Sequence, residues 1–285
     1  GVRGNGSSPS MDLVVFDLDG TLLNKQSVIS DYTRDTLQLL QDNGVAYTVA
    51  TGRALHAAST LLEGHGFHLP HIYKNGVVIW NPEHGRYSQS HLLTQGEIRH
   101  LLQAFIEQQL TPFLFTLEPG DHHAVYHSPL LNDTEKRLVK AFSEERELPV
   151  LPLSELPGDA DITNISALGS QQAIEAVARL VGDEPGLVAY MGVALEGEDL
   201  RWLDLHHADG NKGSAVASLK QDLGVKRVIC FGDSDNDLSM FALADEAYAP
   251  ENAKAEVKAA ADAVIGHHDA DGIARFLRQR FDLNP

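Results

Sequence analysis

The stretch LVVFDLDGTLL, residues 13–23, contains the pattern that decides how this chain folds. Its first four residues are an apolar run typical of a buried strand. Two carboxylates, Asp17 and Asp19, follow one residue apart, and Gly20-Thr21 then predicts a tight loop. Two acids at a strand end repel each other, so they are tolerated where a cation, a proton or a reaction requires them. Taken alone, the same pattern is also typical of an ordinary turn.

The first part of the chain alternates predicted strands with predicted helices. Strands are predicted at 13–16, 46–50 and 72–73, and a helix is predicted at 55–63. Another helix is predicted from Ser30, a favourable N-cap, through Leu40, before the stop signal Asn43-Gly44. This alternation favours right-handed βαβ units and a parallel sheet covered by helices on both faces.

The middle of the chain has a different pattern. Antiparallel strands are predicted at 77–80 and 85–90, and they are followed by helices at 94–109, 134–145 and 171–181 and by strands at 113–117, 124–127, 187–193 and 202–206. From Gly210 the alternation of helix and strand returns. We therefore expect an α/β protein with a Rossmann-like parallel-sheet core, residues 11–82 and 208–285, and an inserted α+β domain, residues 83–207.

The composition limits the possible partners and the compartment. A net charge of −18 opposes binding to nucleic acid and to anionic membranes, because their phosphates would be repelled. No apolar run approaches the roughly 18 residues of a membrane span. The single cysteine, Cys230, lies in an apolar run, which predicts a buried thiol and a reducing, cytoplasmic location. Residues 1–10 are small and polar, which predicts a tag or a disordered lead.

Four predicted loops carry polar residues at positions where core strands end or the returning helix begins. They contain Asp17 with Asp19, Thr51-Gly52-Arg53, Lys212 within Gly210–Ser214, and Asp233–Asp237. In open parallel sheets, ligands bind outside the carboxyl ends of the strands. Loops that are distant in sequence are therefore expected to converge on one site.

The residue types in these loops fit phosphoryl chemistry. The Asp17 carboxylate can attack phosphorus, and Asp19 can protonate the leaving oxygen and later deprotonate water. Asp233 would join Asp17 in holding Mg²⁺, which prefers oxygen ligands. Lys212 and the Thr51 hydroxyl would bind the phosphate group.

Several other site types find no support. The segment Asp233–Asp237 imitates the start of an EF-hand calcium loop but lacks the required Gly and the final Glu. The sequence around Lys212 lacks the Walker A pattern, and no G-x-G-x-x-G follows the first strand. Each loop by itself also has an ordinary explanation: a single lysine is usually solvated, and Thr51-Gly52-Arg53 is a common strand-to-helix connection.

In this order, the four segments resemble the motifs of the haloacid dehalogenase superfamily, and most closely its Cof-like phosphatases. The matching patterns are D-x-D-G-T-L-L, T-G-R, a late K-G and G-D-x-x-N-D, and the resemblance extends from Asp12 to the C-terminus. It implies that Asp17 is the nucleophile and Asp19 the general acid and base. It also implies phosphate binding by Thr51, Gly52, Lys212 and Asn236, Mg²⁺ binding by Asp17, the Asp19 backbone carbonyl and Asp233, and support from Asp237, Asn75 and Arg53.

The resemblance further implies that the insertion is a large α/β cap that closes over the core and selects the substrate. Relatives often carry Met-Gly-Asn-Ala after the last core strand, whereas this chain has Pro250-Glu251-Asn252-Ala253. Asn252 is expected to keep a helix-capping role there. The altered residues before it make the substrate harder to transfer from relatives than the chemistry.

The sequence therefore predicts a Mg²⁺-dependent phosphatase that acts on a small phosphorylated metabolite, of the sugar phosphate, flavin mononucleotide or pyridoxal phosphate type. The reaction would pass through an aspartyl phosphate. Two alternatives remain open: a phosphomutase of related cap type, and a phospho-accepting signalling module. The chain is expected to be a monomer or a weak homodimer.

Overall fold

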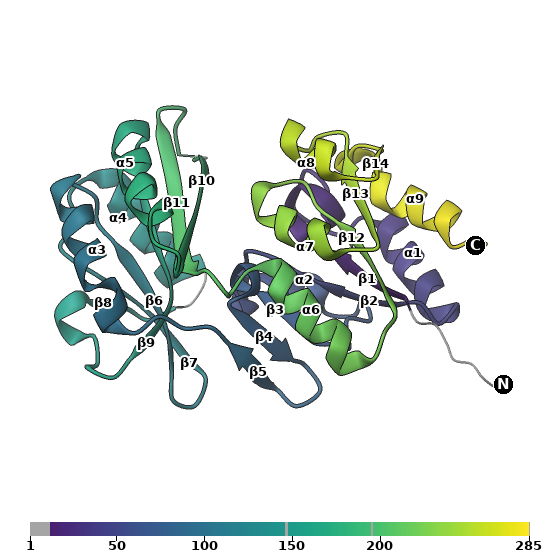
Figure 1. Cartoon of the computed structure of the whole chain (residues 1–285), viewed down its shortest axis with the longest axis horizontal. Helices are drawn as coiled ribbons and strands as arrows, with labels where there is room; N and C mark the ends of the chain where they lie inside the picture. Colours follow the sequence, from purple (N-terminus) through teal and green to yellow (C-terminus); the bar gives the residue numbers. More distant parts are fainter. Residues whose placement is uncertain (1–11, 146–147, 195, 285) are drawn as a thin grey trace. The chain divides into compact units, whose positions relative to one another are not determined.

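The structure is a computed structural model that describes residues 12–145, 148–194 and 196–284 (Figure 1). The described residues of Gly1–Gln89 and Asn211–Pro285 form one compact unit, and those of Ser90–Gly210 form a second. The second unit is thus an insertion into the first. The predicted lead, residues 1–10, lies outside the described residues. Among the residues that are described, no helix is long and apolar enough to cross a membrane.

The first unit, called the core unit, contains a parallel five-stranded sheet of order β14-β13-β12-β1-β2. Its strands are β1 (Asp12–Phe16), β2 (Ala46–Val49), β12 (Arg227–Phe231), β13 (Glu246–Pro250) and β14 (Ala263–Ile265). In the register of this sheet, Val14 of β1 lies opposite Ile229 on one side and Tyr47 on the other. The apolar run that precedes Asp17 therefore forms a central strand, as is typical of parallel sheets buried on both faces.

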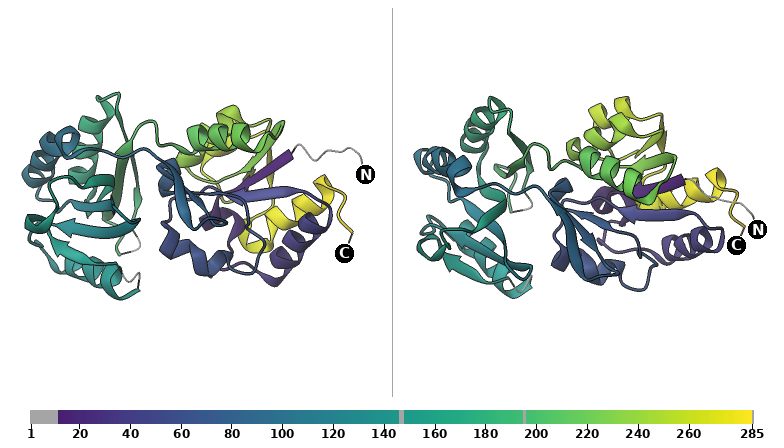
Figure 2. Two further views of the ribbon diagram at one scale, coloured as in Figure 1. Left: turned by 90° about the horizontal axis from the view of Figure 1, so that it is seen from below. Right: turned by 60° about the horizontal axis from the view of Figure 1, so that its bottom comes forward.

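Helices cover both faces of this sheet (Figure 2). They are α1 (Asp31–Asp42), α2 (Leu55–Leu62), α6 (Lys212–Leu223), α7 (Leu238–Leu243), α8 (Ala255–Ala260) and α9 (Gly272–Arg280). On one face, Val15 packs in a cluster with Val216 of α6 and Met240 of α7. On the other face, the ring of Phe231 contacts the ring of Phe276 in α9. The predicted α/β fold with a parallel sheet is confirmed.

A three-stranded sheet of order β3-β4-β5 completes the core unit. It consists of β3 (His71–Tyr73), β4 (Val78–Asn81) and β5 (Arg86–Ser90). A parallel bridge between Ala50 and Ile72 joins the start of this sheet to the end of β2. The turn Lys74–Gly76 after β3 contains Asn75 in the left-handed region, with φ 58°. This turn brings a third segment to the edge where β1 and β2 end.

The second unit, called the inserted unit, has its own six-stranded sheet of order β10-β11-β9-β6-β7-β8. Its strands are β6 (Phe113–Glu118), β7 (His122–His127), β8 (Val150–Pro152), β9 (Asp161–Ser170), β10 (Leu187–Val193) and β11 (Leu200–His207), and its helices are α3 (Gln95–Glu107), α4 (Asp133–Lys140) and α5 (Gln171–Gly182). Neighbouring strands are antiparallel except for β7 and β8. Phe105 of α3 and Ile174 of α5 pack in one cluster with Ile165 and Leu203 of the sheet.

Strand β9 lies in the middle of this sheet and was not predicted from the sequence. Its ten residues include polar side chains such as Asn164 and Ser166, which are uncommon in strands. The neighbouring strand supplies their partner, because Asn164 and Ser166 both donate to Oδ1 of Asp204 in β11, at 2.7 and 3.0 Å. A tertiary interaction thus compensates for the weak strand preference of these residues.

Candidate active site

The loop that follows β1 is a compact turn around Asp17. The backbone N–H groups of Leu22 and Leu23 donate to the carbonyls of Asp17 and Leu18, at 3.2 and 3.0 Å. The Asp17 carboxylate accepts from the Leu18 N–H at 2.8 Å and is buried. Gly20 has φ +75°, which favours glycine, and a Cβ at this position would collide with the carboxylate of Asp233. Glycine at position 20 therefore lets two acidic loops approach each other.

Lys212 places a buried ammonium group beside Asp17. It is the first residue of α6, whose N-cap Asn211 accepts a hydrogen bond from the Ser214 N–H. The Lys212 Nζ lies 3.2 Å from Oδ1 of Asp17 and 2.8 Å from Oδ1 of Asp237, and its side chain has no exposed area. Burial disfavours the ammonium form, but the two carboxylates outweigh burial and raise the pKa of Lys212. The lysine is therefore charged.

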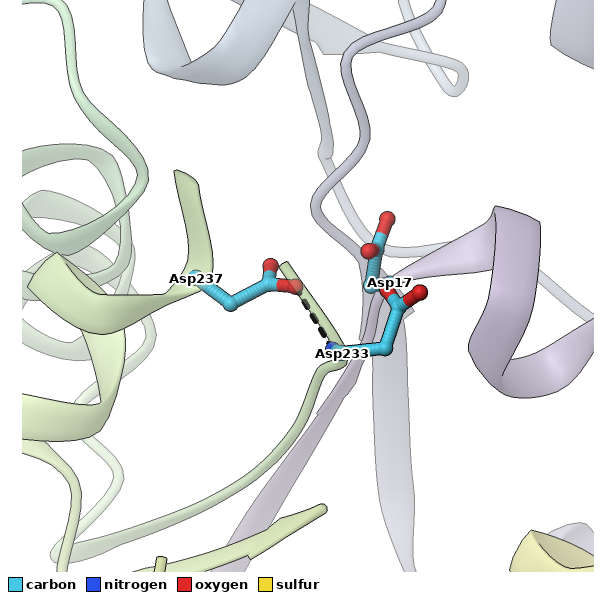
Figure 3. A group of neighbouring side chains, drawn as sticks. All are labelled: Asp17, Asp233 and Asp237. Atoms are coloured by element: carbon cyan, nitrogen blue, oxygen red, sulfur yellow. Dashed lines mark hydrogen bonds between the residues drawn. The ribbon is translucent and has the colours of Figure 1, made fainter. Parts of the chain in front are cut away.

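The loop after β12 contributes Asp233 and Asp237. Oδ2 of Asp237 accepts from the backbone N–H groups of Asp233 and Ser234, at 2.9 and 3.1 Å, which fixes the turn between the two acids. Thr21 donates its hydroxyl to Oδ1 of Asp233 at 3.3 Å. Carboxylate oxygens of Asp17, Asp233 and Asp237 all lie within 4.8 Å of one another (Figure 3).

These three carboxylates carry more negative charge than Lys212 offsets. Burial raises the pKa of Asp17 well above its ordinary value, the charge of Asp237 raises it further, and Lys212 opposes part of the rise. Burial and then Asp237 also raise the pKa of Asp233. A second cation would relieve this repulsion, and a set of carboxylate oxygens is the donor set of a hard divalent ion. The residues present therefore fit a divalent metal.

The side chain of Asp19 is not part of this acidic cluster and pairs with Arg53 instead. Its Oδ1 and Oδ2 accept from Nη2 and Nε of Arg53, at 2.7 and 2.8 Å. Nη1 of Arg53 donates to the carbonyl of Ala57 at 2.8 Å, so α2 holds the guanidinium in place. The Asp19 side chain is 55% exposed, which leaves it accessible to solvent and to a ligand. Arg53 therefore links the loop after β2 to the second aspartate of the first loop.

Asn75, in the turn after β3, connects two of the predicted loops: the one that contains Thr51 and Gly52, and the one that contains Asn236. The Thr51 hydroxyl is buried and accepts from the Arg53 N–H at 3.1 Å, and a hydroxyl in this position can still donate its hydrogen. The Asn75 N–H donates to the Thr51 carbonyl at 3.0 Å, and Asn75 Oδ1 accepts from Nδ2 of Asn236 at 2.7 Å. A Cβ on Gly52 would crowd the Asn75 amide. Within the described part of the chain, the buried Oδ1 of Asn236 has no hydrogen-bond partner.

Sequence reasoning misjudged Asn252. It does not cap a helix: α8 has Lys254 as its N-cap, without a side-chain cap bond. Instead Nδ2 of Asn252 donates to the carbonyl of Gly20 at 2.8 Å, and Oδ1 accepts from the His268 N–H at 3.0 Å. Asn252 thus belongs with the loop of Asp17. Nothing local in the sequence distinguishes this long-range bond from a cap, because an asparagine after a strand is compatible with both.

Residues 14–277 match the family of haloacid dehalogenase-like hydrolases. The chain belongs to this family. The predicted Cof-like resemblance is confirmed. The prediction that the chain is an enzyme of the phosphatase class is also confirmed, because relatives that cover 94–95% of the chain are named as phosphatases.

Two relatives of this hydrolase illustrate the match in sequence. It is 26% identical over 280 residues to the 5-amino-6-(5-phospho-D-ribitylamino)uracil phosphatase YitU of Bacillus subtilis (strain 168), covering 95% of this chain and 98% of the relative. It is 22% identical over 275 residues to the pyridoxal phosphate phosphatase YbhA of Escherichia coli (strain K12), covering 93% of this chain and 97% of the relative.

Solved structures show the same fold. A haloacid dehalogenase-like hydrolase from B. subtilis is similar with a TM-score of 0.76 and 24% identity, covering 93% of this chain and 98% of the other. A second haloacid dehalogenase-like hydrolase, from Bacteroides thetaiotaomicron, has a TM-score of 0.74 and 24% identity, with 95% and 99% coverage. The likeness extends over the inserted unit as well as the core unit.

Proposed function

We propose that this hydrolase cleaves the phosphate monoester of a small metabolite through an aspartyl phosphate on Asp17, with Mg²⁺ as cofactor. One observation carries the proposal: the buried Lys212 ammonium lies between the carboxylates of Asp17 and Asp237 at the end of a central parallel strand. A charged lysine and clustered carboxylates at this position form a preorganised site for a dianionic phosphate and a cation.

The steps follow from the side chains present. An oxygen of Asp17 attacks phosphorus and the bond from phosphorus to the leaving oxygen breaks. Asp19, protonated and turned from Arg53 toward the substrate for this step, gives its proton to that oxygen. Water then attacks phosphorus, Asp19 takes the water proton, and breakage of the bond to Asp17 restores its carboxylate and releases inorganic phosphate. Lys212 and Thr51 donate to the phosphate oxygens throughout.

Mg²⁺ would be held by Asp17 and Asp233, with Asp237 in support and the Asp19 backbone carbonyl as a further ligand. When bound, it neutralises the crowded carboxylates and the charge of the phosphate. Lys212 keeps Asp17 oriented, and the turn bonds from Asp237 keep Asp233 in position. Asn236, fixed by Asn75, presents an unpartnered acceptor within the described site, which suits a ligand with a hydrogen to donate.

The substrate class is a small phosphorylated metabolite. Relatives that span the chain are named as phosphatases of a phosphorylated ribitylaminouracil and of pyridoxal phosphate, both small molecules with one phosphomonoester. The inserted unit is proposed to act as the cap that selects among such substrates. Within the family, hydrolysis is favoured over phosphoryl transfer between hydroxyls, because the family is one of hydrolases.

The proposal is tested by replacing Asp17 with Asn and assaying p-nitrophenyl phosphate with Mg²⁺. We expect kcat to fall about a thousandfold or more, because the amide is not a nucleophile. Asp31→Asn is the matched control: Asp31 begins α1, its side chain is 91% exposed, and its variant should keep wild-type kcat. Retained activity in Asp17→Asn would defeat the assignment of the nucleophile.

A further inference from the structure

The loop that carries Asp17 and Asp19 is held by a segment from the other end of the chain. Asn252 reaches the Gly20 carbonyl across 232 positions of sequence, and its Oδ1 holds the His268 N–H. Three further bonds join the same regions: His268 Nδ1 to the Leu23 carbonyl at 2.8 Å, the Lys25 N–H to Asp269 at 2.8 Å, and Ser30 to Asp271 at 2.6 Å. We call Asn252, His268, Asp269 and Asp271 the C-terminal clasp.

Within the clasp, Asn252 bonds nearest to the two catalytic aspartates. The loop's own turn bonds engage the carbonyls of Asp17 and Leu18, whereas the Gly20 carbonyl is engaged from outside by Asn252. Gly20 follows Asp19 directly and has φ +75°, a conformation that the short loop depends on. A bond to the Gly20 carbonyl therefore fixes the peptide next to the proton-transferring residue.

The chemistry at this position requires an amide. One atom must donate to a carbonyl, and another must accept from an N–H, and asparagine provides both from a short side chain. Aspartate would keep the acceptor for the His268 N–H but would place a carboxylate oxygen against the Gly20 carbonyl. The isosteric substitution Asn252→Asp therefore removes the donor of the amide and keeps its acceptor.

We propose that Asn252 is a positioning residue of the reaction: through the Gly20 carbonyl it holds Asp19 where the proton is transferred. The proposal rests on the function proposed above. It predicts a lower kcat without a change in substrate binding, since the Asn252 side chain bonds to Gly20 and His268 and to none of the residues proposed to bind phosphate. A misplacement of about 1 Å at a catalytic group is enough to reduce a rate strongly.

The test compares Asn252→Asp and Asn252→Ala with a matched control, Asn43→Asp. Asn43 also donates its amide to a backbone carbonyl, that of Leu39, at 2.8 Å, but it lies at the end of α1. The measurements are kcat and KM for p-nitrophenyl phosphate with Mg²⁺, the melting temperature, and amide hydrogen exchange of the segment 20–25.

We expect both Asn252 variants to lose at least tenfold in kcat, with KM within twofold of wild type and faster exchange in the segment 20–25. Asn43→Asp removes an exposed amide bond and should leave kcat and the exchange of that segment unchanged, whatever its effect on the melting temperature. A kcat within twofold of wild type in Asn252→Asp would overturn the proposal. Failure of both Asn252 variants to fold would also overturn it, because the amide would then be a structural support.

The failure of the proposed function is distinguishable from the failure of this inference. If the wild-type chain hydrolyses no phosphate monoester, the function fails, and the exchange comparison alone decides whether Asn252 anchors the loop. If wild type is active and the Asn252 variants match it, only the inference fails.

Discussion

Two buried carboxylates, one in each unit, show how differently the same group is used. Asp17 in the core unit is 6% exposed, and Glu135 in the inserted unit is 1% exposed. Glu135 accepts from the Thr111 N–H at 3.2 Å, the Thr111 hydroxyl at 2.7 Å and the Leu131 N–H at 2.8 Å. Asp17 instead shares one lysine with Asp237 and lies close to Asp233.

Burial of an acid therefore does not by itself indicate a reactive site. Glu135 has its hydrogen-bonding capacity met by neutral donors, as is typical of a structural buried group. Around Asp17 the protein does not neutralise all of the negative charge, so a bound cation would have to balance the rest. Acids whose pKa is shifted in this way cluster at functional sites. We therefore expect that removing a charge at the Asp17 site abolishes activity, whereas removing the charge of Glu135 changes stability and leaves activity intact.

The largest expected effect on stability is from Lys212→Met. This variant leaves three close carboxylates without their cation, and breaking a buried ion pair from one side costs about 3–5 kcal/mol. We expect a loss of that size in the free energy of unfolding, measured with urea in metal-free buffer, together with loss of phosphatase activity. The control is Lys220→Met on the same helix, where the lysine is partly exposed and 3.9 Å from Asp245. A loss below about 1 kcal/mol for Lys212→Met would show that the carboxylates around Asp17 do not depend on the lysine charge.

A smaller effect is expected from adding Mg²⁺ to the metal-free chain. Because the pKa values of Asp17 and Asp233 are raised, the folded chain binds more protons than the unfolded chain above the ordinary Asp value of 3.8. Their contribution to stability therefore falls as the pH rises from that value through the raised ones. Mg²⁺ replaces those protons, so it should stabilise the chain more at pH 7.5 than at pH 5.0.

At a Mg²⁺ concentration of a hundred times Kd, the gain is about 2.7 kcal/mol. Thermal unfolding of wild type and of Asp233→Asn at both pH values measures it, with Asp31→Asn as the control for charge. We expect the gain to be largely lost in Asp233→Asn. Equal gains in wild type and Asp233→Asn would show that the acidic cluster does not hold the metal.

The smallest effect is expected at Glu135 in the inserted unit. Glu135→Gln replaces one acceptor oxygen with an NH₂ group among three donors, which should cost about 1–3 kcal/mol of unfolding free energy. Activity on p-nitrophenyl phosphate should stay within twofold of wild type. Glu144→Gln, at an exposed position of the same unit, is the control for stability. Loss of activity with unchanged stability would mean that Glu135 has a role beyond structure.

Much of the core unit was predictable because its signals are local. The apolar run before Asp17, the N-cap at Ser30 and the stop at Asn43-Gly44 each specify an element within a few residues, and the structure has β1 at Asp12–Phe16 and α1 at Asp31–Asp42. The convergence of Asp17, Lys212 and Asp233 followed from the rule that carboxyl ends of parallel strands meet at one edge.

The rest depends on contacts that no local pattern encodes. Strand β9 was missed because its polar residues are stabilised by Asp204, a residue on another strand. Asp237 was predicted only as a supporting residue, although it pairs directly with the buried Lys212. Asn252 was assigned to a helix cap because its two partners, at Gly20 and His268, are known only once the chain is folded.

The pairing of β1 with β12 has a consequence for how the chain is made on the ribosome. Asp12 and Arg227, which face each other in this pair, are 215 positions apart. At translation rates of about 5–20 residues per second, β1 can pair with β2 early but waits roughly 10 to 40 s for β12. The inserted unit emerges completely during that wait, and its sheet needs no strand from outside. The inserted unit can therefore complete its own sheet before β12 reaches β1 and the loops of Asp17 and Asp233 are brought together.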